Sequence, residues 1–273
     1  MPFTTETTIA SFGGKLLKLS HPSTTTTTEM ALNIYLPPAA LTSPPTKVPV
    51  LIYLSGLTCS PENCSEKGFF QHGASRRGLA VIYPDTSPRG LSLAGDKDSW
   101  DFGEAASFYI NAEQAPFAGT YNMETYITKE LPSALFSDAE LGQYLDGTRV
   151  SITGHSMGGH GALTLYLKNP GLYKSVSAFA PIANPSLCPW GEKAFTGYLG
   201  PDREKWKAHD ATELIGKWKG KHVNMLVDVG TGDNFYRQGQ LLPENFEKAA
   251  NEAGVEGFIL RYQEVSLFLV MNV

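Results

Sequence analysis

A serine between two glycines stands where an apolar segment changes into a helical one. Residues 154–158 read GHSMG; they follow the β-branched run 149–153 and open a helical pattern at 158–167. A sharp turn from strand to helix lifts a serine hydroxyl clear of a sheet and requires small neighbours, which the glycines supply. The helix N-terminus behind the serine favours developing negative charge. The pattern predicts Ser156 as the nucleophile of an acyl-transfer reaction; a chance glycine-rich turn is the alternative.

Acyl transfer also requires two hydrogen-bond donors for the oxyanion of the tetrahedral intermediate. In a turn of this kind, one donor is the backbone N–H of the residue after the nucleophile, which is Met157 here. The second comes from the loop after an early strand, and the sequence SGLT at 55–58 directly follows the apolar run 48–54. The alternative interpretation of 55–58 is an ordinary turn.

The acid of a serine triad in this arrangement follows the nucleophile in the chain, and a histidine follows the acid. Asp233 lies in a glycine-rich loop beyond the predicted strand 223–227, which is the expected place for that acid. Asp228 is the competitor, but it falls at the end of the strand itself. An aspartate in such a loop can also be a turn or capping residue. We expect Asp233, rather than Asp228, to be the triad acid.

The histidine that should complete the triad is not found after Asp233. The chain has six histidines, and all of them precede that residue: His21, His72, His155, His160, His209 and His222. His155 lies within the serine turn and His160 on the helix that leaves it, so neither is well placed to approach the serine oxygen from across the sheet. We expect these two to pack or to support the site indirectly, and His209 and His222 to lie at the surface or the core edge.

Short apolar segments alternate with helical patterns along the chain. Strands are predicted at 48–54, 79–83, 149–153, 175–179, 223–227 and 258–262, and helices at 123–135, 158–167 and 242–253. Such alternation is typical of an α/β fold with a mostly parallel sheet covered by helices on both faces. A long loop is expected at 94–114, where it could shape a site. The threonine run 24–28 is expected to be a solvated turn between two strands.

Composition argues against several classes of protein. The 273 residues, 42% hydrophobic and 18% charged, suit a single domain, and a net charge of −5 without a basic run argues against a nucleic-acid partner. The three cysteines, Cys59, Cys64 and Cys188, are too few for a disulfide framework and lack neighbouring metal ligands. No segment has the apolar length of a signal peptide or membrane span. We expect a soluble cytoplasmic protein without a metal.

Long stretches of the chain resemble the S-formylglutathione hydrolases, or esterase D family, of the α/β-hydrolase superfamily. The resemblance runs from about Phe12 to Glu264. It is carried by the segments LSGLTCSPENC, YPDTSPRG, DSWDFGEAASFYINA, GHSMGGHGAL, NPGLYKSVSAFAPIANPSLCPWGEKAFTGYLG, KWKAHDAT and QLLPENF. So many long matches are far more specific than the serine motif alone.

The resemblance implies an α/β-hydrolase fold and a cytoplasmic thioesterase with no metal or organic cofactor. The family cleaves S-formylglutathione to formate and glutathione in formaldehyde detoxification, so a glutathione thioester would be the small-molecule substrate, and the family suggests a homodimer. By the same resemblance, Ser156 is the nucleophile and Asp233 the triad acid. Leu57 and Met157 would supply the two oxyanion N–H groups.

Two further residues resemble family positions near the site. Cys59, in GLTC, resembles the cysteine that makes the family sensitive to thiol reagents; its alternative role is that of a small buried hydrophobic residue. Trp100 resembles the tryptophan of the family's SWDFG segment, and its alternative role is that of a core aromatic residue. The resemblance implies that both contact the substrate.

The end of the chain departs from the family pattern. The family continues after RYQE, residues 261–264, with a Tyr-Asp-His-Ser segment that holds the catalytic histidine and then with a closing helix, whereas residues 265–273 read VSLFLVMNV. We expect a single domain over 1–273, with a truncated C-terminal helix, an activity in doubt, and an apolar end that tends to aggregate. The alternatives are a general carboxylesterase of small acyl esters, or a catalytically impaired truncated isoform or gene model.

Overall fold

The computed structural model describes residues 3–218 and 222–264, and these build one nine-stranded sheet with the order β1-β2-β3-β5-β4-β6-β7-β8-β9. The strands are β1 (Thr4–Ser11), β2 (Gly14–Pro22), β3 (Glu29–Leu36), β4 (Val48–Leu54), β5 (Ala80–Pro84), β6 (Leu145–His155), β7 (Val176–Phe179), β8 (His222–Gly230) and β9 (Glu256–Gln263). The helices are α1 (Pro61–Lys67), α2 (Phe70–Arg77), α3 (Met123–Thr125), α4 (Leu131–Ser137), α5 (Met157–Lys168), α6 (Pro189–Leu199), α7 (Arg203–Trp206), α8 (Ala211–Gly216), α9 (Asn234–Arg237) and α10 (Pro243–Glu252). Three shorter turns complete them: the π-helical η1 (Tyr126–Glu130) and the 3₁₀ turns η2 (Pro185–Leu187) and η3 (Lys207–His209).

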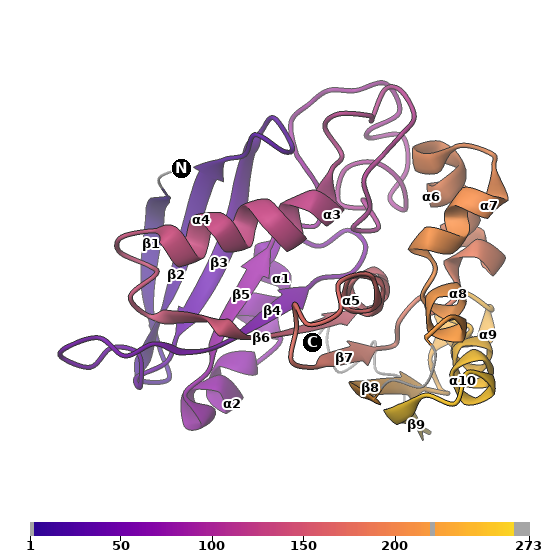
Figure 1. Cartoon of the computed structure of the whole chain (residues 1–273). Coiled ribbons are helices and arrows are strands. Elements are labelled where there is room, and N and C mark those ends of the chain that lie inside the picture. Colours follow the sequence, from indigo (N-terminus) through magenta and orange to yellow (C-terminus); the bar gives the residue numbers. More distant parts are fainter. Residues whose placement is uncertain (1–2, 219–221, 265–273) are drawn as a thin grey trace.

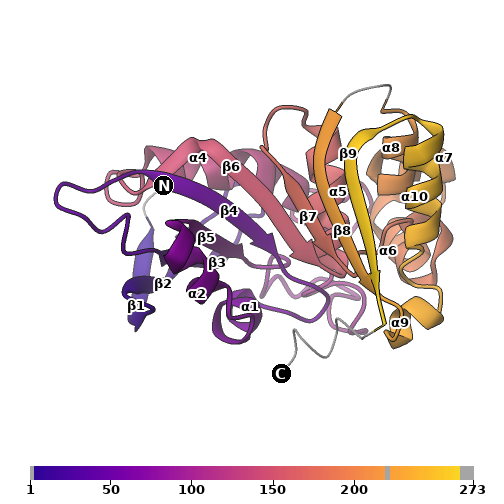
Figure 2. The ribbon, with the colours of Figure 1, turned by 90° about the horizontal axis from the view of Figure 1, so that it is seen from below.

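The sheet has a parallel part and an antiparallel part. The strands from β5 to β9 pair in parallel with their neighbours, whereas β1, β2 and β3 pair antiparallel and join the rest through β5. Helices lie on both faces: Figure 2 shows α1 and α2 on one side of the sheet and α5, α8 and α10 on the opposite side. The predicted α/β fold, mostly parallel and covered on both faces, is confirmed.

The six predicted strands are all present, and the ends of all of them except β4 are shifted. The prediction for 48–54 matches β4, whereas β6 begins at Leu145, four residues before the predicted start. The sequence did not give bounds for β1, β2 and β3, which lie at the antiparallel end of the sheet (Figure 1). β1 (TTETTIAS) is exposed along most of its length, so it lacks the apolar pattern that marks a strand.

The threonine run 24–28 is a turn between β2 and β3, as predicted, but it is not fully solvated. Thr26 is buried. Glu130 also accepts hydrogen bonds from Thr24 N (2.8 Å), Thr25 N (3.1 Å) and Ser23 Oγ (2.6 Å). These bonds hold the pKa of Glu130 at about 2, against the opposing effect of burial. The turn therefore fastens the antiparallel strands to the helical segment that carries Glu130.

The predicted helix 123–135 is interrupted rather than uniform. The π-helical turn η1 lies between α3 and α4, and Pro132 stands in the first turn of α4. Proline has no N–H and its ring crowds the preceding turn, which accounts for the wider turn before it. The predictions for α5 and α10 agree with the structure to within one residue at every end.

The expected long loop at 94–114 is part of the connection between β5 and α3. Part of its second half is buried: Ala106, Phe108 and Tyr109 are inaccessible to solvent. Ala105, Phe108 and Tyr109 also have positive φ angles, between 52° and 63°. Such backbone is costly for residues other than glycine and is held by surrounding contacts. The predicted departure at 265–273, with its truncated helix, lies outside the residues that the structure describes.

Candidate active site

Ser156 occupies a strained turn between β6 and α5. Its φ and ψ angles are 57° and −119°, and its N–H donates to the carbonyl oxygen of Phe179 at 2.9 Å. A side chain at Gly154 would collide with the backbone of Gly158, and one at Gly158 would collide with the carbonyl oxygen of Leu54. The two glycines of the serine motif are therefore required by close backbone approach, and the predicted strand-turn-helix is confirmed.

The register of the sheet brings a second loop beside this serine. β4 and β6 are parallel neighbours with Leu54 opposite Gly154, so the loop after β4 emerges at the same edge as Ser156. A Cβ atom built on Gly56 would lie 3.2 Å from the Cβ atom of Ser156. Leu57, the next residue, lines a pocket of about 180 Å³ together with Ser156. The predicted neighbourhood of the loop 55–58 and the nucleophile is confirmed.

Met157 stands on the other side of the nucleophile. It is the first residue of α5, so its N–H has no carbonyl partner within the helix and can serve another acceptor. Its side chain is buried, and its Sδ atom accepts a hydrogen bond from Phe108 N at 3.3 Å. The helix N-terminus therefore lies behind Ser156 as predicted.

The long loop of residues 94–114 contacts both sides of the serine. The carbonyl oxygen of Ala105 accepts a hydrogen bond from Thr58 N at 3.0 Å, and the hydroxyl of Tyr109 donates to the carbonyl of Ser55 at 2.8 Å. The bond from Phe108 to Met157 belongs to the same stretch. Residues 105–109 thus hydrogen-bond to the loop after β4 and to the start of α5. These contacts account for the burial and the strained backbone of residues 105–109.

Asp233 lies just past the end of β8, at the sheet edge where Ser156 emerges. It is 2% exposed, and its Oδ1 atom accepts a hydrogen bond from Phe235 N at 2.7 Å, which caps α9. The alternative role of Asp233, as a capping residue, therefore occupies one of its two carboxylate oxygens. Asp228, the competitor, points elsewhere: it belongs to β8, and Gln263 Nε2 donates to its Oδ1 at 2.6 Å.

His155 and His160 differ in their surroundings. His160 is fully buried, its Nε2 lies 3.1 Å from the carbonyl oxygen of Phe108, and burial lowers its pKa to about 3. It is a packing residue, as predicted. His155 instead lines the pocket of Ser156; burial lowers its pKa to about 4, while the charge of Asp233 acts in the opposite direction. Within residues 3–218 and 222–264, no hydrogen bond joins the Ser156 hydroxyl to either histidine.

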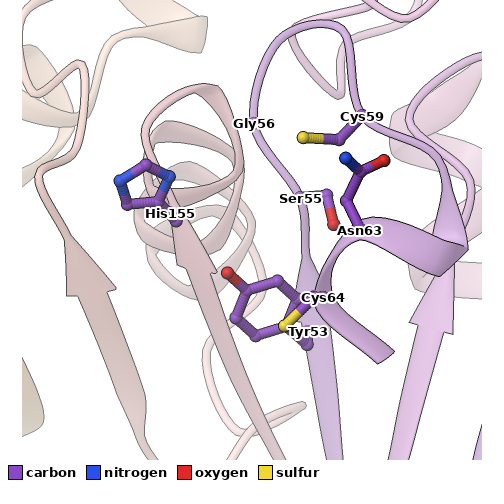
Figure 3. A pocket seen from close by; sticks show the side chains of 7 residues that line it. All are labelled: Tyr53, Ser55, Gly56, Cys59, Asn63, Cys64 and His155. Carbon is purple, nitrogen blue, oxygen red and sulfur yellow. The ribbon is translucent and has the colours of Figure 1, made fainter. Parts of the chain in front are cut away.

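A smaller pocket of about 20 Å³ lies behind the loop and adjoins the first. Figure 3 shows His155 on one side of it and Ser55, Cys59 and Asn63 on the other, with Tyr53 and Cys64 below. The Oγ atom of Ser55 and the Nε2 atom of His155 are buried without a hydrogen-bond partner in the described part of the chain. A polar space of this size is sufficient for about one water molecule.

Three aromatic side chains line one part of the larger pocket. Trp100 meets Trp190 edge to face with ring centroids 5.6 Å apart, and Trp190 lies 4.7 Å from Phe235. Trp100 is 55% exposed, so the alternative of a core aromatic residue is wrong. Trp190, Phe235 and Asn63 also line these pockets, although no sequence pattern marked them as pocket residues. They come from α6, α9 and α1, and only the folded arrangement brings them together.

Cys59 lines both pockets and is half-buried. It is therefore not the fully buried hydrophobic residue of the alternative interpretation. Burial raises the pKa of its thiol, and the positive charge of Arg89 only partly offsets this effect. Among the residues that the structure describes, no group of three or more His, Cys, Asp and Glu side chains could hold a metal ion. In the same residues, no helix is long and apolar enough to cross a bilayer.

Comparisons with a family model and with curated relatives both match this chain to esterases over most of its length. Residues 23–262 match the Esterase family model, described as "Putative esterase". The S-formylglutathione hydrolase of Rattus norvegicus is 47% identical over 269 residues, which cover 96% of this chain and 93% of the relative. The S-formylglutathione hydrolase of Saccharomyces cerevisiae is 47% identical over 281 residues, covering 94% and 92%.

A solved S-formylglutathione hydrolase structure from Agrobacterium tumefaciens superposes with a TM-score of 0.88 at 40% identity, covering 98% of this chain and 94% of that one. A ferulic acid esterase superposes with a TM-score of 0.66 at 17% identity, which supports the fold alone. With the strained serine turn and its pocket in place, these similarities show that the chain belongs to the S-formylglutathione hydrolase family of α/β-hydrolases.

Proposed function

We propose that this protein is a serine thioesterase that hydrolyses S-formylglutathione to formate and glutathione. The observation that carries the proposal is the strained backbone of Ser156, which lines a pocket beside the loop that contains Leu57. Relatives with nearly half of their residues identical over almost the whole chain bear the same activity in their names. The family resemblance supplies the reaction, and the geometry of the site supports it.

In the proposed reaction, a general base takes the proton of Ser156 and the serine oxygen attacks the thioester carbonyl. The carbonyl oxygen becomes an oxyanion, which the backbone N–H groups of Leu57 and Met157 stabilise. The bond to sulfur then breaks and glutathione leaves as its thiolate. A water molecule, activated by the same base, attacks the formyl-enzyme and releases formate, which regenerates Ser156.

We assign supporting roles to three further residues. Asp233 is the triad acid, because it lies just past the end of β8 and its charge acts on His155 in the pocket wall; the cap of α9 uses only one of its two oxygens. Cys59 and Trp100 contact the substrate, since both line the pocket that contains the nucleophile. The formyl group is the smallest acyl group, and one additional methylene alters binding by only about 1–3 kcal/mol, so acetyl esters should react as well.

An extended version of the chain tests which residue is the general base. Formate release from S-formylglutathione is measured for the 273-residue chain and for a version in which Glu264 is followed by a Tyr-Asp-His-Ser segment and a helix. Activity restored in the second version alone would assign the base to that segment. Equal turnover by both would show that the base comes from elsewhere in the chain; His155, which lines the pocket, and His160 would then be the first residues to substitute, each by Gln. Ser156→Ala is the inactive control, and turnover that persists in it would contradict the proposed nucleophile.

A general carboxylesterase is the second candidate, favoured by the aromatic lining of the pocket. Trp100, Trp190 and Phe235 offer an apolar surface that would accommodate aryl or acyl groups. Comparing kcat/KM for S-formylglutathione with the values for acetyl and butyryl aryl esters separates the two candidates. We further propose a cytoplasmic location and a role in formaldehyde detoxification, which a thioesterase with unpaired cysteines would suit.

A further inference from the structure

The carbonyl oxygen of Cys59 is held by two side chains from a different part of the chain. Thr86 Oγ1 donates to it at 2.5 Å and Arg89 donates through a terminal nitrogen at 2.9 Å. Both donors belong to the segment that follows β5. Cys59 lies only two residues beyond Leu57, so a bond to its carbonyl fixes the end of the loop that faces Ser156.

Arg89 is itself held rigidly. Its Nε donates to Asp85 Oδ2 at 2.7 Å and a terminal nitrogen donates to Asp85 Oδ1 at 2.8 Å, which is a two-pronged ion pair. Asp85 is buried and also accepts from Thr86 N at 2.7 Å, while Glu104 lies 3.7 Å from the other arm of the guanidinium. A planar guanidinium can serve the carboxylate and the Cys59 carbonyl together, whereas a lysine ammonium cannot reproduce this geometry.

The loop needs such restraint. Thr58 has a φ angle of 66°, a backbone conformation that is costly for a β-branched residue. Its N–H is committed to the carbonyl of Ala105, and the carbonyl of Ser55 is committed to Tyr109. The bonds from Thr86 and Arg89 therefore restrain the far end of the loop, and the bond from Arg89 is made by a charged group that a buried carboxylate fixes.

We propose that Arg89 is a positioning residue for the thioesterase reaction: it holds the Cys59 carbonyl so that the N–H of Leu57 stays directed at the oxyanion of the Ser156 adduct. This inference rests on the proposed function of the loop. Arg89 acts through the backbone and touches no reacting atom. Its loss should weaken stabilisation of the transition state without changing the affinity for the ground-state substrate.

The chain offers a matched control. Arg149 makes the same kinds of contact at the opposite end of β4: its Nε donates to Asp146 Oδ2 at 2.6 Å, and a terminal nitrogen donates to the carbonyl of Lys47 at 3.3 Å. Arg149→Lys therefore changes an arginine that also joins an aspartate to a backbone carbonyl, with one bond to the carboxylate instead of two, at a place remote from the serine turn. Arg89→Lys and Arg149→Lys are compared with the unsubstituted chain.

Three measurements are made: steady-state kinetics (kcat and KM) with a small acyl ester, the rate of Ser156 labelling by an organophosphonate, and amide hydrogen exchange over residues 55–60. In Arg89→Lys we expect kcat and the labelling rate to fall about tenfold or more, KM to stay within about twofold, and exchange in the loop to accelerate. Arg149→Lys should leave all three unchanged. If Arg89→Lys does not fold, Thr86→Val removes the other donor to the same carbonyl and carries the same test with a smaller expected fall.

Retained kcat and labelling rate in a folded Arg89→Lys protein would overturn the proposal, and so would a rise in KM alone, which would indicate a role in substrate binding. Faster exchange without slower labelling would leave Arg89 a purely structural role and would overturn it as well. Failure of the unsubstituted chain to hydrolyse S-formylglutathione counts against the proposed function only. The ratio of labelling rates and the loop exchange test Arg89 separately from that activity.

Discussion

Gly56 lies directly against Ser156: a Cβ atom added to Gly56 would be 3.2 Å from the Cβ atom of the serine and 3.3 Å from the carbonyl oxygen of His155. Contacts this short require the neighbours to move by a few tenths of an ångström. Gly56→Ala should therefore displace the loop or the nucleophile, and we expect kcat/KM for a small acyl ester to fall about tenfold or more. Steady-state kinetics and thermal unfolding of the same preparation test this expectation.

Gly73→Ala is the control for this experiment, because a Cβ atom at Gly73 would meet nothing within 4 Å. Gly73 lies inside α2, where alanine favours the helix by roughly 0.5–1 kcal/mol. Activity should be unchanged and stability equal or slightly higher. Equal kinetics in Gly56→Ala and Gly73→Ala would show that the loop tolerates the added methyl group.

Gly158→Ala should damage the fold rather than the chemistry alone. The added Cβ atom would overlap the carbonyl oxygens of Leu54 and Ser55, which are backbone atoms of the central strand β4 and its loop. Overpacking typically costs about 1–3 kcal/mol, and we expect a value near the upper end here because neither backbone segment can rotate away. The measurement is the midpoint of urea unfolding. A midpoint equal to that of the unsubstituted protein would contradict the close approach of α5 to β4.

Cys59 should react with iodoacetamide slowly at neutral pH. Burial raises the pKa of its thiol above the ordinary value, so the reactive thiolate is scarce at pH 7 and becomes more abundant as the pH rises. We expect the alkylation rate, followed by mass spectrometry of the Cys59 peptide, to be still rising at pH 9. The buried Cys64 and Cys188, whose pKa values burial raises to about 12, should react more slowly. A rate that levels off below pH 8 would exclude a raised pKa.

Acid should destabilise the protein through its buried histidines. Burial lowers the pKa of His160 to about 3, whereas an unfolded chain takes up that proton near pH 6.5. Between these values the unfolded state binds more protons, so stability falls as pH falls, by about 2 kcal/mol for this residue between pH 7.5 and pH 5. Urea unfolding at the two pH values measures the loss. His160→Gln should reduce the difference by a similar amount, and an unchanged difference would show that other groups cause it.

The sequence predicted the parts of the site that depend on local chain chemistry. The serine turn is local, because Gly154 and Gly158 must be small for β6 to turn into α5. The bounds of β4 were also predicted, since a strand buried between two neighbours is a continuous apolar run. The position of Asp233 followed from the end of β8 in the same way.

The remaining wall of the pocket could not be predicted, because it depends on contacts between distant segments. Trp190 and Phe235 are 45 residues apart in the chain, yet their rings lie 4.7 Å apart. No periodic pattern marks either of them as a pocket residue. His155 was expected to pack beside the site, but the same sheet edge that exposes Ser156 also brings its ring into the pocket wall.

The segment between β5 and α3 has two parts that evolution should treat differently. Residues 105–109 bond to both flanks of the nucleophile, so an insertion there would shift two donors at once. Residues 90–95, beyond Arg89, begin and end with Gly90 and Gly95, at which an added side chain would meet nothing within 4 Å. Related chains should therefore differ in length within residues 90–95 and keep a constant length at Arg89 and at 105–109. Drift in this outer part can then reshape the outer surface of the segment while the chemistry beneath it stays unchanged.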